Sequence, residues 1–574
     1  MGNRVFPFYL MNHRFLKNWA SVLMLATIGT LRADVKMPAI FGDHMVLQQG
    51  AMLPVWGTAD PGEKVTVTVG GETAAATADG DGHWMVKLPA LPAGTAPTAM
   101  TVTGKNKLSF SDVLVGEVWV CSGQSNMEFG MAGAHDASTE IPQANDPQLR
   151  LFHVDHKTSL QPETDVTGSW QLCTPETVRG FTAVGYFFGH ELRSNLKRPV
   201  GLIESSWGGT VAQAWTSVSG LAKEPALHNY IVAHDHALAA YPKAQADFAA
   251  NTATYQAAMA AWNRDVNPGF QAALKDWAKA DQAAKAAGQP SPRRPLPSTP
   301  APRPPSDPSG GPGVPANLFN GMIAPLIPYA IKGTIWYQGE SNAGAAIEYR
   351  TLFGRMITDW REKWGEGDFP FLFVQLASFD AGPTPLWAYL RESQLKTLAL
   401  TKTGMASAVD LGDFENLKNI HPHDKHDVGL RLALAARHVA YGGDLVYSGP
   451  IFASAKTEGD AIRVSFTHTG GGLVIGRPPW IAPNAPSWPT DKLTGFEIAG
   501  DDGNYVPADA KIDGKSVLVS SAQVAKPVDV RFAWSNIVIT NLYNKEGLPA
   551  APFRTDNQPP PAPPAKPVPA PKAP

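Results

Sequence analysis

Short apolar runs that do not alternate with polar residues, and that each end in a polar loop, constrain the fold of this chain most. Val118–Cys121 is the first such run, and the polar segment 122–126 follows it directly. An unbroken apolar run is typical of a strand that is buried on both faces of a parallel sheet. Two more runs, 199–203 and 333–337, also end in polar, glycine-containing loops, at 204–210 and 338–342.

A helical apolar rhythm over 181–196 separates the first two runs, since Val184, Phe188 and Leu192 recur every four residues. Strand, helix and strand of these lengths predict a parallel βαβ unit. The polar loops should therefore open at one edge of one sheet, where α/β proteins place their chemistry. We predict an α/β fold with a parallel sheet.

The rest of the chain divides by composition. Short β-branched strands with Gly and Asp turns predict a small β domain at 34–112 and another at 441–556, with the α/β domain at 113–440 between them. Alanine-rich residues 241–288 predict an inserted helical hairpin, and the Pro-rich stretch 289–315 predicts an extended linker or mobile loop. The insertion as a whole covers 241–315, and 557–574 reads as a disordered Pro/Ala/Lys tail.

Composition and the amino-terminus limit the class of protein. A net charge of −3 over 574 residues gives no reason to expect nucleic acid as a partner. The only two cysteines, Cys121 and Cys173, exclude a disulfide scaffold, and their pairing stays open. Residues 1–33 are typical of a signal peptide, so we expect a secreted or periplasmic protein with no membrane span after its removal.

The polar loops supply the groups that acyl transfer needs: a nucleophile, a base and donors for an oxyanion. Ser125 is the candidate nucleophile and His421 the candidate base, because a serine hydroxyl is inert without a neighbour that takes its proton. Backbone N–H groups of Ser125 and of Gly208 or Gly209, with the side-chain amide of Asn342, could hold the oxyanion. Ser122 is a rival nucleophile that more simply caps the turn.

Four motifs in order, GQSNM at 123–127, WGGT at 207–210, WYQGESN at 336–342 and IHP at 420–422, closely resemble the sialate O-acetylesterase family of SGNH-type serine hydrolases. The resemblance extends to MVLQ at 45–48, GFEIAG at 495–500 and NLYNKEGLPAAPFRTD at 541–556. It implies a flavodoxin-like hydrolase domain between β-sandwich-type domains that removes O-acetyl groups from sugars without a cofactor. It also implies the same roles for Ser125, His421, the glycines and Asn342.

The acid that would orient the histidine departs from the family pattern. SGNH-type hydrolases usually carry an acidic residue three positions before the histidine, and this chain has Lys418 there and Asn419 one position later. Asp410 or Asp413, after the preceding strand, could take that role, or the enzyme could work as a Ser–His dyad. Glu340 is a third candidate that more plausibly ties the loops together.

The sugar is not identified by the sequence, and sialic acid esters and acetylated plant polysaccharides such as xylan are both open. Arg391 is the one arginine that we considered as a partner for a substrate carboxylate. The residues that we predict to contact the substrate are Gln124, Trp207, Gln338, Glu340 and Arg391.

Two other classes of function remain as alternatives. His421, His423 and His426 could form a metal site, although catalytic zinc usually has three protein ligands and Lys425 puts a cation among these residues. A non-catalytic carbohydrate-binding protein could stack sugars on the three tryptophans Trp207, Trp215 and Trp387.

Overall fold

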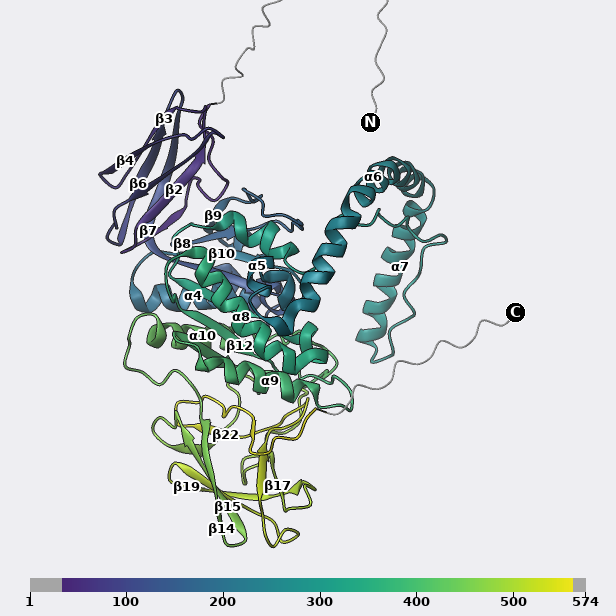
Figure 1. Ribbon diagram of the computed structural model, residues 1–574. Coiled ribbons are helices and arrows are strands. Elements are labelled where there is room, and N and C mark those ends of the chain that lie inside the picture. Colours follow the sequence, from purple (N-terminus) through teal and green to yellow (C-terminus); the bar gives the residue numbers. More distant parts are fainter. Residues whose placement is uncertain (1–33, 561–574) are drawn as a thin grey trace, which may run out of the picture.

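A computed structural model describes residues 34–560, so the predicted signal peptide at 1–33 and residues 561–574 lie outside the described part. The amino-terminal strands, purple in Figure 1, stand at one end of the molecule. The short strands predicted for residues 34–112 are confirmed. The six strands of this region are β1 (Val46–Gln48), β2 (Leu53–Thr58), β3 (Lys64–Val69), β4 (Glu72–Thr77), β5 (His83–Leu88) and β6 (Gly94–Thr103).

One long strand, β7 (Lys107–Gly123), joins these strands to the central sheet. Its first half pairs antiparallel with β6, and its second half pairs in parallel with two strands of the central sheet. It therefore runs without a break through the predicted domain boundary between residues 112 and 113. The buried residues of both regions form one continuous hydrophobic cluster.

The central sheet has the order β13-β12-β11-β7-β10-β8-β9. Every neighbouring pair is parallel except β8 and β9, so the predicted parallel sheet is confirmed. The strands besides β7 are β8 (Asp146–His153), β9 (Trp170–Cys173), β10 (Val200–Ser206), β11 (Gly333–Tyr337), β12 (Phe371–Gln375) and β13 (Thr403–Ser407).

Helices cover both faces of this sheet. Trp119 of β7 contacts Phe188 of α4, whereas Trp336 of β11 contacts Phe353 and Trp360 of α8. Trp336 is level with Ser122 of β7, three residues after Trp119, and side chains alternate along a strand, so α4 and α8 lie on opposite faces. The helices of this region are α1 (Ser125–Glu128), α2 (Ala137–Glu140), α3 (Pro175–Val178), α4 (Ala183–Leu196), α5 (Val218–Leu221), α8 (Ala346–Trp364), α9 (Leu386–Lys396) and α10 (His426–Val439).

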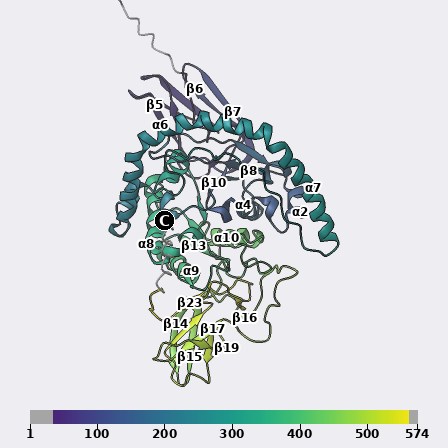
Figure 2. The ribbon, with the colours of Figure 1, turned by 90° about the vertical axis from the view of Figure 1, so that its right-hand side faces the viewer.

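Two helices project from the sheet domain, α6 (His228–Asp265) and α7 (Asn267–Ala286). They form the predicted hairpin, but α6 begins 13 residues before residue 241 and includes Pro242 in its interior. Residues 289–315 contain neither helix nor strand, as expected of a linker or loop. The indole N–H groups of Trp262 and Trp277 donate to carbonyl groups of this stretch. Figure 2 shows the two helices arching over the molecule.

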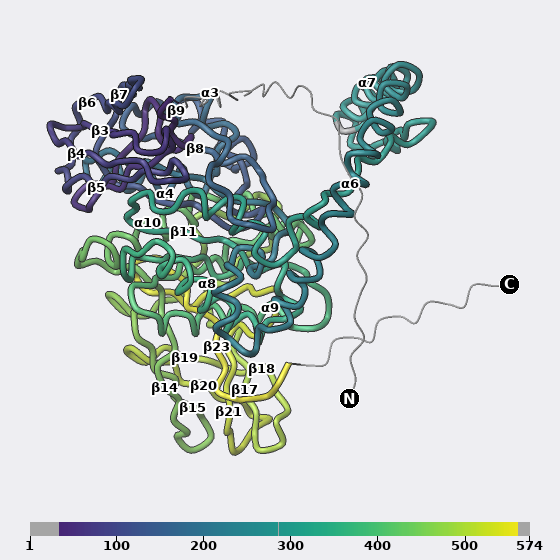
Figure 3. The backbone as a smooth tube through the Cα atoms, turned by 45° about the horizontal axis from the view of Figure 1, so that its top comes forward, coloured from purple at the N-terminus to yellow at the C-terminus, as the bar shows by residue number. Residues whose placement is uncertain are grey.

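The carboxyl-terminal strands, green to yellow in Figures 1 and 3, form small antiparallel sheets with a hydrophobic cluster of their own. The short strands predicted for residues 441–556 are confirmed. The strands of this region are β14 (Ile451–Glu458), β15 (Ala461–Thr467), β16 (Leu473–Ile475), β17 (Phe496–Ala499), β18 (Val506–Pro507), β19 (Asp509–Asp513), β20 (Ser516–Ser520), β21 (Asp529–Phe532), β22 (Leu542–Asn544) and β23 (Phe553–Arg554).

Both cysteines are buried free thiols, which answers the open question about their pairing. Between residues 34 and 560 we find no helix with the length and apolar character that crossing a bilayer requires.

Gly123 at the end of β7 cannot carry a side chain. Its φ is +139°, and a Cβ there would lie 2.2 Å from the carbonyl oxygen of Tyr337 on β11. We expect Gly123→Ala to lower the free energy of unfolding by about 3 kcal/mol, because it adds backbone strain and a clash between central strands. Gly80→Ala is the control, since that turn glycine has open space around its Cβ position. Equal urea midpoints for the two variants would contradict the prediction.

Candidate active site

Ser125 and His421 meet at the carboxyl edge of the central sheet. Ser125 is the first residue of α1, directly after β7, and its Oγ lies 2.8 Å from Nε2 of His421. The two residues are 296 positions apart in the chain. A separation of 2.8 Å between these two atoms is one at which an imidazole can accept a serine proton. The two residues predicted as nucleophile and base are thus brought into contact.

Asn126 links the loops that carry these two residues. Its side-chain N–H group donates to Oε1 of Glu340 at 2.6 Å and to the carbonyl oxygen of Ile420 at 3.0 Å. Asn126 follows Ser125, and Ile420 precedes His421. The hydrogen bonds of one buried amide therefore set the distance between Ser125 and His421.

Lys425 holds the other end of the Asn126 amide. Its Nζ donates to Oδ1 of Asn126 at 2.6 Å, and the side chain is wholly buried between the rings of Phe129 and Tyr337. Burial lowers the pKa of Lys425 to about 7, although the nearby Glu340 carboxylate opposes that shift. Burial also raises the pKa of Glu340. Lys425, Asn126 and Glu340 thus form a buried polar network behind Ser125.

His421 has a lowered pKa. Burial is the main cause, and the positive charge of Lys425 adds to it, while Glu128 acts in the opposite direction. A lowered pKa keeps the imidazole neutral near pH 7, which is the form that accepts a proton. The site therefore favours His421 as a base.

Neither aspartate predicted to orient His421 contacts its ring. Asp410 is buried and pairs with Arg431 at 2.6 Å and with the hydroxyl of Tyr543 at 2.9 Å. Asp413 accepts from the side-chain amide of Asn419, whose Oδ1 accepts the backbone N–H of His421. Among residues 34–560, no carboxylate lies within hydrogen-bonding distance of Nδ1 of His421. Asp410 is thus a partner of α10, and Asp413 reaches His421 only through Asn419.

The predicted oxyanion donors are largely engaged within the protein. The backbone N–H of Gly208 donates to Oε2 of Glu128 at 2.6 Å. The side-chain amide of Asn342 donates to Oε1 of Gln213 at 3.1 Å, and its oxygen accepts from Ala212 and Gln338. In this arrangement the Gly208 N–H is not open to a substrate, which corrects that part of the prediction.

Three of the residues predicted to contact the substrate form hydrogen bonds with other parts of the protein instead. Gln124 accepts from the backbone of Ser341, and Gln338 donates to Thr210 and Asn342; both side chains are buried. Glu340 faces Asn126, as described above. These three residues tie the polar loops together, which is the alternative that we had considered for Glu340.

Arg391 is not the carboxylate partner that we predicted. It is wholly buried, and its guanidinium donates to carbonyl oxygens of residues 376, 377, 535 and 536. Two of these carbonyl groups follow β12 and two follow β21, so Arg391 joins both segments to α9. Trp215 and Trp387 are also buried, so neither offers a face to a sugar. Trp207 is partly exposed and stacks on His156 with ring centroids 4.0 Å apart.

The three histidines considered as metal ligands point to different partners. His421 contacts Ser125, the ring of His423 contacts the carbonyl oxygen of Gly133, and the ring of His426 contacts Asp136 at 3.0 Å. Among residues 34–560, no three His, Cys, Asp or Glu side chains are grouped in a way that could hold a metal ion.

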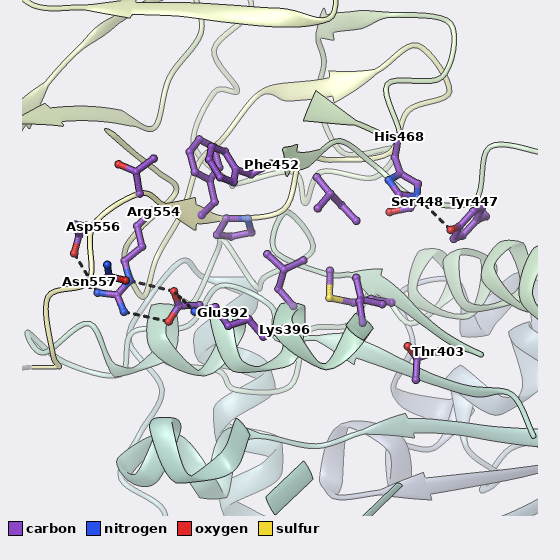
Figure 4. Close-up of a pocket in the computed structure, with 17 residues that line it drawn as sticks. Glu392, Lys396, Thr403, Tyr447, Ser448, Phe452, His468, Arg554, Asp556 and Asn557 are labelled. Carbon is purple, nitrogen blue, oxygen red and sulfur yellow. Dashed lines mark hydrogen bonds and ion pairs between the residues drawn. The ribbon is translucent and has the colours of Figure 1, made fainter. Parts of the chain in front are cut away.

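A separate cavity of about 500 Å³ lies between α9, β13 and the carboxyl-terminal strands (Figure 4). Glu392 and Arg554 form an ion pair at one side of it, and Tyr447 contacts His468 at the other. Neither Ser125 nor His421 lines this cavity. It is therefore distinct from the Ser125–His421 site.

Comparison with known proteins agrees with an ester hydrolase. The model of a carbohydrate esterase family, sialic acid-specific acetylesterase, matches residues 115–246 and 317–438. The chain is 32% identical to mouse sialate O-acetylesterase, over 71% of this chain and 74% of the mouse protein. It is 29% identical to the human enzyme, over 72% of this chain and 73% of that protein.

Among solved structures, a carbohydrate acetylesterase from Xanthomonas citri matches with a TM-score of 0.71 and 37% identity, over 91% of this chain and all of the other. The fold and these matches define a carboxylic ester hydrolase that acts as a carbohydrate O-acetylesterase. The chain belongs to the sialate O-acetylesterase family.

The sequence patterns did not reveal three residues of the site: Asn126, Glu128 and Lys425. Asn126 and Glu128 lie beside the predicted nucleophile, but a single Asn or Glu in a polar loop carries no distinct signal. Lys425 was interpreted as a cation that argues against a metal site. Residues 421–427, which surround Lys425, are mostly polar and give no sign that this lysine is buried.

The charge of Lys425 should set the working pH range. Lys425→Met removes a positive charge that lowers the pKa of His421, so that pKa should rise. His421 must be neutral to act as a base, so we expect the acid limb of the kcat/KM profile to move to higher pH. Of the other groups that act on His421, Glu128 and His423 stay in place. Lys418→Met, which removes an exposed lysine of the same loop, should leave the limb where it is. A limb that moves to lower pH in Lys425→Met would refute this assignment.

Asp410 should matter for stability and not for the chemical step. Asp410→Ala leaves Arg431 buried without its carboxylate, which costs about 3–5 kcal/mol of stability. Asp413→Asn keeps an oxygen acceptor for Asn419 and should be close to wild type in both stability and kcat. Thermal unfolding and kcat, measured below the unfolding transition, separate the two effects. A folded Asp410→Ala protein with kcat lowered 100-fold would make Asp410 part of the catalytic machinery.

Proposed function

We propose that this protein hydrolyses O-acetyl esters of sugars through an acetyl-enzyme formed on Ser125. The observation that carries the proposal is the 2.8 Å contact between Oγ of Ser125 and Nε2 of His421. The strands β7, β10, β11, β12 and β13 support an SGNH-type, flavodoxin-like domain. Their spatial order, numbered along the chain, is 2-1-3-4-5, and β8 and β9 extend one edge. The site lies at the ends of β7 and β11, which is the point in the sheet where the strand order reverses.

In the proposed mechanism, His421 takes the proton of Ser125 as the Oγ attacks the acetyl carbonyl carbon. The tetrahedral intermediate then collapses, its bond to the sugar oxygen breaks, and the imidazolium gives its proton to that oxygen. Water, deprotonated by His421, then attacks the acetyl carbon of the acetyl-enzyme. The bond from that carbon to Oγ breaks, acetate leaves, and the imidazolium returns its proton to Oγ of Ser125. Each half-reaction uses the same proton acceptor, so no further base is required.

The oxyanion requires donors other than Gly208, whose N–H is held by Glu128. We assign this role to the backbone N–H of Ser125, the backbone N–H of Gly209 and the side-chain amide of Asn342. The side-chain N–H group of Asn342 would then give up its hydrogen bond to Gln213 and donate to the substrate oxygen. Such a donor typically lowers the barrier by ~3 kcal/mol.

We further propose that the enzyme works as a Ser–His dyad. The hydrogen bonds from Asp413 to Asn419 and from Asn419 to His421 support this, because they fix only the backbone of His421. Among the described residues, the ring of His421 has no acidic partner. Glu128, the carboxylate whose charge raises the pKa of His421, offers the nearest electrostatic substitute.

The substrate is an O-acetylated sugar, either a sialic acid ester or an acetylated plant polysaccharide such as xylan. The amino-terminal signal pattern at 1–33 supports action outside the cytoplasm. We also propose the domain division 34–112, 113–440 and 441–556, with 241–315 as an insertion and 557–574 as a tail. The gap at 247–316 in the family match supports the insertion.

Ser125→Ala should lower acetate release from p-nitrophenyl acetate by about 1,000-fold, because Ser125 is the one serine among residues 34–560 whose hydroxyl contacts the ring of His421. Ser122→Ala is the matched control. The Ser122 hydroxyl is buried and has no hydrogen-bond partner among the described residues, so its loss should leave both fold and turnover intact. Rapid turnover by Ser125→Ala would end the proposal, and a loss confined to Ser122→Ala would move the nucleophile to that residue.

A further inference from the structure

Glu128 places a carboxylate directly beside the nucleophile. Its Oε2 accepts the backbone N–H of Gly208 at 2.6 Å, and its Oε1 lies 3.1 Å from Nε2 of His156. A Cβ on Gly208 would be 3.0 Å from that Oε2 and 3.1 Å from the Cβ of Ser125. The carboxylate and the serine therefore flank the same glycine.

Glu128 stays ionised in this position. Partial burial favours the neutral acid, but the hydrogen bonds from His156 and Gly208 outweigh it and hold the pKa of Glu128 below its ordinary value. About a third of the side chain, 32%, remains exposed. A bound substrate therefore meets a negative charge that the protein holds in one place.

The cations near Glu128 do not offer a substrate a permanent positive charge. Those that act on Glu128 itself are His156, which contacts its Oε1, and His153, which pairs with Glu204, and a histidine is charged only when it is protonated. Lys425 is wholly buried, and its charge is opposed by Glu340 on the other side of Asn126. Arg391, the arginine considered for a substrate carboxylate, is buried with its donors on backbone carbonyls.

From this geometry we infer that Glu128 is a specificity-determining residue that selects O-acetyl esters of uncharged sugars over those of sialic acids. The inference rests on the proposed function of Ser125 and names its substrate class. A sialic acid brings its own carboxylate into the site, where Glu128 repels it. Two like charges about 8 Å apart in a partly hydrated site change a rate by about five- to tenfold, and salt screens the effect.

The test compares two substrates that differ only in charge: the methyl glycoside of 9-O-acetyl-N-acetylneuraminic acid and its C1 carboxamide. Acetate release by the full chain is measured at pH 8 in 20 mM and 500 mM NaCl. We expect wild type to prefer the carboxamide by about five- to tenfold in kcat/KM at low salt, and high salt should reduce the preference to about twofold. Glu128→Gln should show little preference at either salt concentration.

Two further variants sharpen the result. Glu128→Asp keeps the charge and should keep the preference, whereas Glu72→Gln, which removes an exposed carboxylate of β4, should not change it. If Glu128→Gln turns over neither substrate, the inference is tested by the wild-type ratio of kcat/KM for the carboxamide and the acid, and by the change of that ratio with salt. A wild type that hydrolyses the acid as fast as the carboxamide overturns the inference, as does a preference unchanged by salt and by Glu128→Gln.

The outcome also separates this inference from the proposed function. Hydrolysis of p-nitrophenyl acetate that survives Ser125→Ala would remove the proposed function itself. Hydrolysis that depends on Ser125 but ignores the sialic acid carboxylate would leave the proposed function in place and remove only the role of Glu128.

Discussion

The active site depends on the side-chain amide of Asn126. It accepts a hydrogen bond from Lys425 and donates hydrogen bonds to Glu340 and to the backbone of Ile420, so it joins segments that follow β7, follow β11 and precede α10. A buried amide has few ways to satisfy both its oxygen and its nitrogen, and each hydrogen bond left unmade would cost about 1–3 kcal/mol. This constraint keeps Ser125 and His421 in register, because each is the direct neighbour of a residue in the network.

The position of that network follows from β7. The same strand pairs with the amino-terminal strands and then enters the middle of the parallel sheet, where it is clamped between β10 and β11. At its end, the backbone of Gly123 packs so closely on Tyr337 that no side chain fits between them. The serine loop thus starts from a strand that is fixed on both sides, and the loop after β11 starts from the strand that touches it. Two polar loops held this way need only short side chains to reach each other.

The sequence predicts this fold well where the pattern is local. Unbroken apolar runs identify β7, β10 and β11, and the polar residues after them identify the edge that holds Ser125. Partners that depend on three-dimensional packing were not predictable. Asp410 and Asp413 both follow a strand end, yet only the fold shows that Arg431 of α10 takes the first and Asn419 the second. Arg391 illustrates the same limit, since an arginine on a helix gives no sign that four backbone carbonyls will surround it.

The charges around His421 explain how the proposed Ser–His dyad would work without an acid on the imidazole. The tetrahedral intermediate is an ion pair, a protonated imidazole beside an oxyanion. Glu128 raises the pKa of His421 and so stabilises the imidazolium, whereas Lys425 lowers it and, as a cation, favours the oxyanion. Each of these charges, that of Lys425 in its protonated form, therefore opposes one half of the ion pair and supports the other. Because Lys425 is buried between two rings and Glu128 is held by a backbone N–H, neither charge has to reorganise as the intermediate forms.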